Sequence, residues 1–253
     1  ASGIGAVWGT AYSKQANKIF TAAFIKRQVG LGPMGTGGIY MLEPTASSFN
    51  ITQFYNMDAN GYRTRAASGA LAYGQGSSYT VDANGYAITY NGSNDSESGF
   101  PEGLGVVGTN IDRGLPDNMN ADCYDPASFD QVGKVGLGDL DISDDGKYLF
   151  VMNLYSRKLY RLELNDAYNP TSVVSVNSYA IPSVPVTNGV LRPFAVQYHR
   201  GKVYCGAVAS GENGGSNIVD GATDLYAYVF KLENALSAIP TYNATPAITF
   251  PLN

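Results

Sequence analysis

The sequence is poor in the residues that most enzymes and metal sites use. It has two cysteines, one histidine and one tryptophan in 253 residues, and only 15% of its residues are charged. The single histidine, His199, excludes any site built from several imidazoles. The GxSxG elbow, the HExxH helix and the P-loop are all missing. A glycosidase-type pair of carboxylates needs no such motif, but no pair stands out, so we predict no catalytic residues.

Charge and hydropathy exclude two further classes of partner. The formal net charge is −5, and the longest basic cluster is the pair Lys26 and Arg27, which argues against nucleic acid as a partner. Apolar runs stay well short of the roughly 20 residues that span a bilayer, so we predict no membrane span. The chain starts without the basic and apolar regions of a signal peptide. We interpret it as a mature or trimmed piece of a secreted protein, with a cytoplasmic protein as the alternative.

The abundant residues favour β-structure. The chain holds 30 glycines and 19 tyrosines, with many asparagines and serines. Glycine and asparagine suit tight turns, and tyrosine suits half-exposed strand surfaces. Low lysine content with this composition favours an extracellular, cell-surface protein. The sequence predicts an all-β fold.

One strand-turn-strand unit recurs along the chain. Its clearest copy is residues 138–164, where Leu140 and Ile142 alternate with polar residues, as a half-buried strand requires. Residues 143–146 (SDDG) form a turn signal. Strands are then expected at 148–152 and 158–164.

Two further copies follow the same order. Strands are expected at 7–12, 19–24 and 39–43, and at 193–198, 203–208 and 225–232. A fourth strand fits after each copy, at 49–55, 172–181 and 245–252. Four antiparallel strands over about 40–55 residues make one propeller blade. We therefore predict one β-propeller domain over residues 1–253, incomplete if it holds only four or five blades. A β-sandwich is the structural alternative, but it has no reason to repeat this unit.

The middle of the chain is less regular. Residues 58–62 (DANGY) recur at 82–86, and Asn-Gly is a strong hairpin signal. We interpret residues 56–104 as a hairpin-rich insertion or an irregular blade. A further strand is expected at 105–111 (GVVGTNI).

Residues 139–164 (DLDISDDGKYLFVMNLYSRKLYRLEL) resemble the repeats of bacterial YVTN/lactonase-like propellers. Residues 8–12, 23–27 and 30–40 resemble the propeller regions of large Bacteroidota-type surface proteins that often carry SdrD B-like domains. Residues 136–143 and 192–194 fit the same group. The resemblance implies a propeller fold and export to the cell surface, and it transfers no functional residues. It also implies that the chain is a fragment or needs a neighbour to complete its ring.

Calcium is the one cofactor that the sequence suggests. Residues 112–125 (DRGLPDNMNADCYD) form an acid- and amide-rich loop without a strand pattern, and calcium prefers such oxygens. The candidate ligands are Asp112, Asp117, Asp122 and Asp125. A solvated acidic loop is the alternative. Asp139 and Asp141 face the propeller channel in one interpretation and bind backbone groups in the other.

Covalent modification offers the remaining candidates. Cys123 and Cys205 form one disulfide if the compartment is oxidising, and otherwise Cys205 is an ordinary buried thiol. Four sequons match the N-glycosylation pattern. They place candidate sites at Asn50, Asn91, Asn94 and Asn243.

Two functions from different classes follow. The favoured one is a non-enzymatic extracellular surface protein, a structural, adhesion or self-assembling module. It would bind itself or other surface proteins through exposed strand edges, or bind glycans. The alternative is a lactonase-like or glycan-cleaving propeller hydrolase that uses the central channel.

Overall fold

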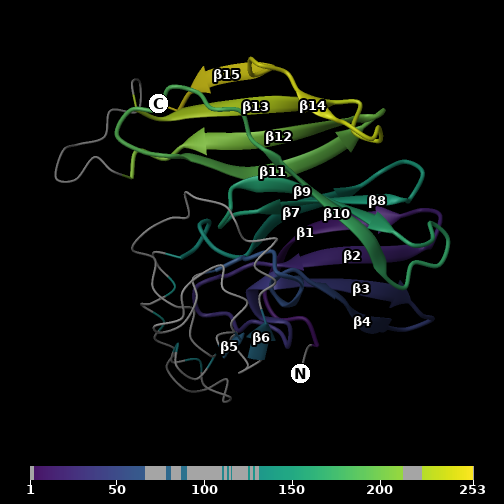
Figure 1. Cartoon of the computed structure of the whole chain (residues 1–253). Coiled ribbons are helices and arrows are strands. Elements are labelled where there is room, and N and C mark those ends of the chain that lie inside the picture. The colour runs from purple at the N-terminus through teal and green to yellow at the C-terminus, as the bar shows by residue number, and fades with distance from the viewer. Residues whose placement is uncertain are drawn as a thin grey trace. The chain divides into compact units, whose positions relative to one another are not determined.

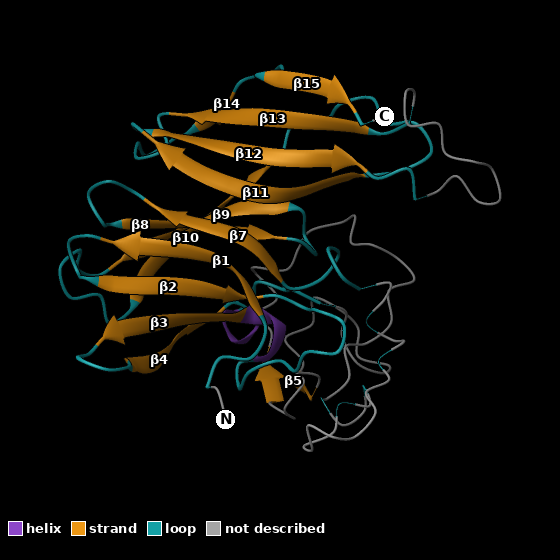
Figure 2. Ribbon diagram, turned by 180° about the vertical axis from the view of Figure 1, so that it is seen from behind, coloured by secondary structure: helices purple, strands orange, loops and turns teal. Residues whose placement is uncertain are grey.

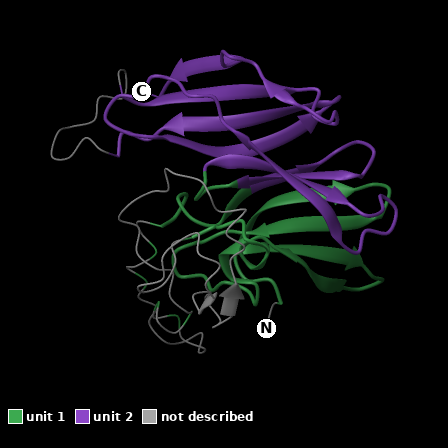
Figure 3. Ribbon diagram, viewed as in Figure 1, with its two compact units in different colours: residues 1–138, 153–156 green, residues 139–152, 157–253 purple. Residues whose placement is uncertain are grey.

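The computed structural model describes residues 3–65, 78–80, 87–89, 110, 113, 115, 125, 128, 131–212 and 224–252, with only the backbone of 78–80 and 87–89. Within these residues the protein is built from antiparallel β-sheets and two 3₁₀ turns (Figure 1). Contacts divide the chain into two compact units (Figure 3). Unit 1 comprises Ala1–Gly138 with Asn153–Ser156, and unit 2 comprises Asp139–Met152 with Arg157–Asn253.

The first sheet belongs to unit 1 and has the order β1-β2-β3-β4. Its strands are β1 (Val7–Ser13), β2 (Lys18–Ala23), β3 (Gly38–Pro44) and β4 (Phe49–Asn56). Each strand pairs antiparallel with the next in sequence. Phe20 and Phe54 meet edge to face, 5.2 Å apart, on the buried side. On the other side Tyr40, Met34 and Ala23 form a small core under the 30–38 loop.

The second sheet has the order β10-β9-β8-β7. Its strands are β7 (Leu137–Ile142), β8 (Tyr148–Asn153), β9 (Lys158–Leu164) and β10 (Val173–Ala180). Strand β8 is almost completely buried, because its run of apolar residues packs on both faces. Strand β10 is largely exposed. The SDDG turn forms as expected, with Gly146 at φ 72° and Ser143 Oγ accepting from Tyr148 N–H.

The third sheet lies in unit 2, and Figure 2 shows its strands in orange. Its strands are β11 (Leu191–His199), β12 (Lys202–Ala209), β13 (Tyr226–Glu233), β14 (Thr241–Tyr242) and β15 (Ile248–Pro251). Both β14 and β15 pair with β13, so they share the fourth position of the sheet. The prediction of a repeated four-stranded antiparallel sheet is confirmed. The last predicted strand, at 245–252, forms as the shorter β15, and β14 precedes the predicted range.

The middle region departs from the sequence expectation. The first DANGY copy was expected to be a hairpin but forms the 3₁₀ helix η2 (Asp58–Asn60), closed by Gly61 at φ 85°. The second copy lies between β5 (Ser78–Thr80) and β6 (Ala87–Thr89), which pair antiparallel. The strand expected at 105–111 falls outside the described residues apart from Asn110, which is in a turn.

Two glycines are required where the N-terminal segment crosses the 30–32 loop. Gly5 has φ +65°, and a Cβ there would lie 2.1 Å from the Gly32 nitrogen. A Cβ on Gly32 would lie 2.4 Å from the Ile4 oxygen. The close approach lets Ala6 N–H donate to the Gly30 carbonyl at 2.8 Å, so the segment before β1 is fixed to this loop.

Candidate functional site

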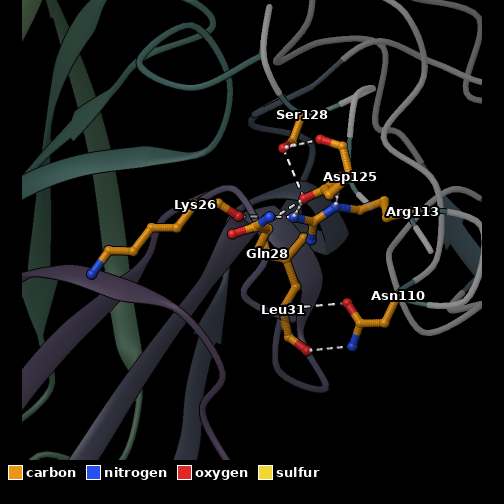
Figure 4. A network of polar contacts seen from close by, with 7 residues as sticks. All are labelled: Lys26, Gln28, Leu31, Asn110, Arg113, Asp125 and Ser128. Carbon is orange, nitrogen blue, oxygen red and sulfur yellow. Dashed lines mark hydrogen bonds and ion pairs between the residues drawn. The ribbon is translucent and has the colours of Figure 1, made fainter. Parts of the chain in front are cut away.

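The loop after β2 is held by side chains from about 80 to 100 residues further along the chain (Figure 4). Asn110 satisfies both backbone groups of Leu31, accepting from its N–H at 2.9 Å and donating to its carbonyl at 3.1 Å. Arg113 donates from Nη2 to the Lys26 carbonyl at 2.9 Å. Asp125 accepts from Gln28 N–H at 3.0 Å. Gln28 needs this support because its φ is +61°, a region that non-glycine residues seldom occupy.

Arg113 and Asp125 form a buried ion pair at the centre of this network. Arg113 Nη2 lies 2.7 Å from Asp125 Oδ2, and the two side chains are 1% and 0% exposed. Ser128 Oγ donates to the same carboxylate oxygen at 2.8 Å. Burial by itself raises the pKa of Asp125, but hydrogen bonds from Arg113, Gln28 and Ser128 outweigh it and hold the pKa below its usual value.

This network gives Asp125 a role that competes with calcium binding. Its carboxylate is already bonded to an arginine, a backbone N–H and a hydroxyl, and a cation would have to displace Arg113. Asp112, Asp117 and Asp122 lie outside the described residues. Among the side chains that the structure describes, no three potential ligands come together around a metal position. Calcium binding by this loop stays a prediction.

A second buried carboxylate belongs to the first DANGY segment. Asp58 accepts from Thr64 N–H at 2.8 Å and from Thr64 Oγ at 2.7 Å. Thr36 Oγ lies 3.3 Å from the carboxylate, and Arg65 Nε lies 3.8 Å away with both side chains fully buried. Asp58 therefore fastens η2 to the 62–65 segment.

Asp139 and Asp141 bind backbone groups, which was one of the two interpretations of the sequence. Asp139 accepts from Val196 N–H at 3.1 Å, and Asp141 accepts from Tyr198 N–H at 2.7 Å. Both carboxylates lie on β7 and both donors on β11, so they join the two sheets of unit 2. Burial raises the pKa of both carboxyls.

Aromatic stacking completes the contact between these two sheets. The Phe150 ring of β8 stacks on the Tyr198 ring of β11, with centroids 5.8 Å apart and planes 14° apart. Arg161 of β9 donates to the carbonyls of Ala235 and Ser237 at 2.8 and 2.7 Å. Within unit 2, two sheets are therefore packed face to face.

The remaining candidate residues are spread over the fold. Cys205 is a free, fully buried thiol whose Sγ lies 3.3 Å from Tyr242 Oη, and Cys123 lies outside the described residues. The bridge between them stays a prediction without structural support. Asn50 is exposed on β4, and Asn243 is half-buried after β14. Asn91 and Asn94 lie outside the described residues.

The first sheet carries an apolar row on its outer face, the face on which Leu42 packs against the small core of Tyr40, Met34 and Ala23. Residues at paired positions on β1 to β4 run across all four strands. This Leu42 row consists of Tyr12, Ile19, Leu42 and Ile51. Tyr12 and Ile51, at the two ends, are 51% and 44% exposed, and Phe49 lies two residues from Ile51 on the same face. None of the four side chains in the Leu42 row is charged.

The third sheet has a corresponding apolar area on the face turned away from the second sheet. The Val229 row crosses β11, β12, β13 and β15 at paired positions. It consists of Ala195, Gly206, Val229 and Ile248. Val208, Ala227 and Phe250 form part of the next row. Ile248 and Phe250 are 53% and 47% exposed, so most of this area is open to solvent.

These features define a class of protein. It is built from repeated four-stranded antiparallel sheets, and buried carboxylates join its segments. No protein-family model matches the chain. The chain is similar to Colossin-D of Dictyostelium discoideum, with 24% identity over 238 residues. The match covers 94% of this chain and 19% of Colossin-D, so the chain spans about a fifth of the length of that relative. None of the helices that the structure describes is long and apolar enough to cross a membrane.

Sequence reasoning missed Arg113 and Asn110. Arg113 stands inside the loop proposed for calcium, and an arginine among acids is a signal that one of the acids is paired. The outer-face rows were also missed. The sequence shows these residues as alternating strand residues. It does not show which face of each sheet stays uncovered, because that depends on what packs against the sheet.

Proposed function

We propose that this chain is a non-enzymatic structural domain of an extracellular surface protein, and that its sheets are blades of a propeller-like stack. Its task is to hold a stable shape and make contacts with neighbouring proteins. It would work without a bound substrate or a catalytic group. Hydrolysis of a lactone or a glycan is the alternative.

One observation carries this proposal. Apolar rows cross four strands on the outer faces of the first and third sheets, and they are exposed at Tyr12, Ile51 and Ile248. In repeat proteins the terminal repeats have polar outer faces, because apolar faces there reduce solubility. Contiguous exposed apolar area marks an interaction site. Both faces are therefore suited to contact another protein surface.

The arrangement of polar groups supports the same conclusion. Asp58, Asp125, Asp139 and Asp141 each accept hydrogen bonds that fasten one segment to another. Carboxylates committed in this way serve stability. The similarity to a fifth of Colossin-D fits a domain within a longer protein, and low charge with many tyrosines fits an extracellular setting.

Immunolabelling of the native source tests the location. Antibodies against the folded chain should label the cell surface or extracellular material in electron micrographs. Label confined to the cytoplasm would overturn the proposal.

A turnover assay tests the absence of catalysis. The purified chain should leave lactones and polysaccharides unhydrolysed over long incubation. Hydrolysis that disappears when one acidic residue is changed to its amide would favour the hydrolase instead. Glu43→Gln serves as a control, because Glu43 is an exposed residue near the end of β3.

A further inference from the structure

We propose that a second copy of this chain covers these faces, with the Leu42 row of one copy packing on the Val229 row of the next. This inference rests on the proposed function and names its partner. The contact joins two different surfaces, so it is heterologous, and such contacts form rings or open filaments.

The two rows differ in side-chain size in a complementary way. The Leu42 row carries a large side chain on every strand, from Tyr12 on β1 to Ile51 on β4. The Val229 row has Ala195 and Gly206 at its β11 and β12 positions. Large side chains need a flat or hollow partner in a close-packed interface. The small residues on β11 and β12 provide one, whereas two Leu42 rows would both present large side chains.

The charges near the rows do not oppose this contact. Lys202, Lys231 and Glu233 stand beside the Val229 row on the same face. They are paired among themselves, with Lys231 Nζ 2.6 Å and Lys202 Nζ 3.5 Å from the Glu233 carboxylate. On the opposite side of the row, Arg192 of β11 lies on the same face and forms an ion pair with Glu212. Paired charges therefore border the uncharged Val229 row on both sides, which is the usual anatomy of a protein interface.

The same kind of contact already exists within the chain. The inner face of the third sheet packs on the second sheet through Phe150 and Tyr198 and through two aspartates of β7. On β11, residues alternate between the two faces, so Ala195 points away from this contact. Gln197 instead reaches the edge of the contact, where its Nε2 donates to Asp141 at 2.6 Å. A further sheet on the outer face would continue the stacking that forms the core of unit 2.

The size of the faces sets the expected strength. Four strands spaced ~4.8 Å apart, each contributing about six residues at ~3.3 Å, cover roughly 400 Å² per copy. The total of about 800 Å² lies at the weak end of specific interfaces. Association should therefore be concentration-dependent, with a dissociation constant between about 1 µM and 1 mM.

Sedimentation velocity of charge-introducing variants tests the contact. Ile51→Glu disables the Leu42 row, and Ile248→Glu disables the Val229 row. Ile239→Glu is the matched control, because Ile239 is 80% exposed and belongs to neither row. Wild type and the control should form species larger than a dimer as concentration rises. Each row variant alone should remain monomeric.

Mixing the two row variants gives the decisive result. Each retains one intact face, so an equimolar mixture should form dimers and stop there. Circular dichroism and thermal melting check that each variant folds. If a glutamate variant does not fold, Ile51→Thr and Ile248→Thr replace it, because threonine is also β-branched. The threonine variants should weaken association severalfold.

Three outcomes would overturn the inference. In the first, the wild-type protein stays monomeric up to about 1 mM. In the second, the wild type associates but the mixture of row variants stays monomeric. In the third, the row variants associate as strongly as Ile239→Glu. A monomeric wild type that still labels the native cell surface would leave the proposed function standing and remove only the second copy as partner.

Discussion

The buried ion pair of Arg113 and Asp125 allows a direct test of what stabilises unit 1. Replacing Arg113 with methionine leaves a buried carboxylate whose remaining donors, among the residues that the structure describes, are Gln28 N–H and Ser128 Oγ. Breaking a buried ion pair by removing one partner costs about 3–5 kcal/mol. Arg113→Met should lower the free energy of unfolding by that amount at pH 7. Urea denaturation followed by tyrosine fluorescence measures it.

Two further variants separate charge from packing. Lys147→Met is the matched control, because Lys147 and Glu163 form an exposed pair with a 3.0 Å contact, and exposed pairs contribute about 0–1 kcal/mol. Adding Asp125→Asn to Arg113→Met should recover about 1–3 kcal/mol, because a neutral amide costs less to bury than an unpaired carboxylate. The amide oxygen can still accept from Gln28 N–H.

The pH dependence has a defined sign. Because the folded-state pKa of Asp125 is lowered below its usual 3.8, the ion pair stabilises the fold above that pH. This stability is lost as pH falls through the lowered pKa. The difference in unfolding free energy between wild type and Arg113→Met should therefore decrease at acidic pH. An Arg113→Met variant within about 0.5 kcal/mol of wild type at pH 7 would refute the reasoning.

Two smaller predictions concern unit 2. The raised pKa of Asp139 and Asp141 means that their contribution to stability is complete below the ordinary carboxyl pKa and declines as pH rises through the raised values. Asp139→Asn with Asp141→Asn should remove this dependence, so the difference in unfolding free energy from wild type should change between about pH 3 and pH 7. A constant difference would contradict it. Burial raises the pKa of Cys205 to about 12. Iodoacetamide at pH 8 should therefore leave Cys205 unmodified in native protein and alkylate it in urea, as peptide mass spectrometry would show, and rapid native alkylation would argue against burial of this thiol.

The strands and their order were predictable because their signals are local. Alternation of apolar and polar residues, and turn chemistry such as SDDG at residues 143–146, depend on neighbours within a few positions. This is why the first three strands of each repeat formed close to where they were expected. The pairing of both β14 and β15 with β13, and the 3₁₀ helix at Asp58–Asn60, depend on contacts that no local pattern contains.

By itself, the sequence determined the all-β class, the repeated four-stranded sheet and the low-charge surface, because composition and periodicity act residue by residue. Only the tertiary structure decided what the acids do and which sheet faces stay open. Asp125 reaches Gln28 across 97 positions of sequence, and Asp141 reaches Tyr198 across 57. Whether a carboxylate binds a metal or an N–H depends on which donor lies within hydrogen-bond distance. Chain folding sets that distance, because it brings remote segments together.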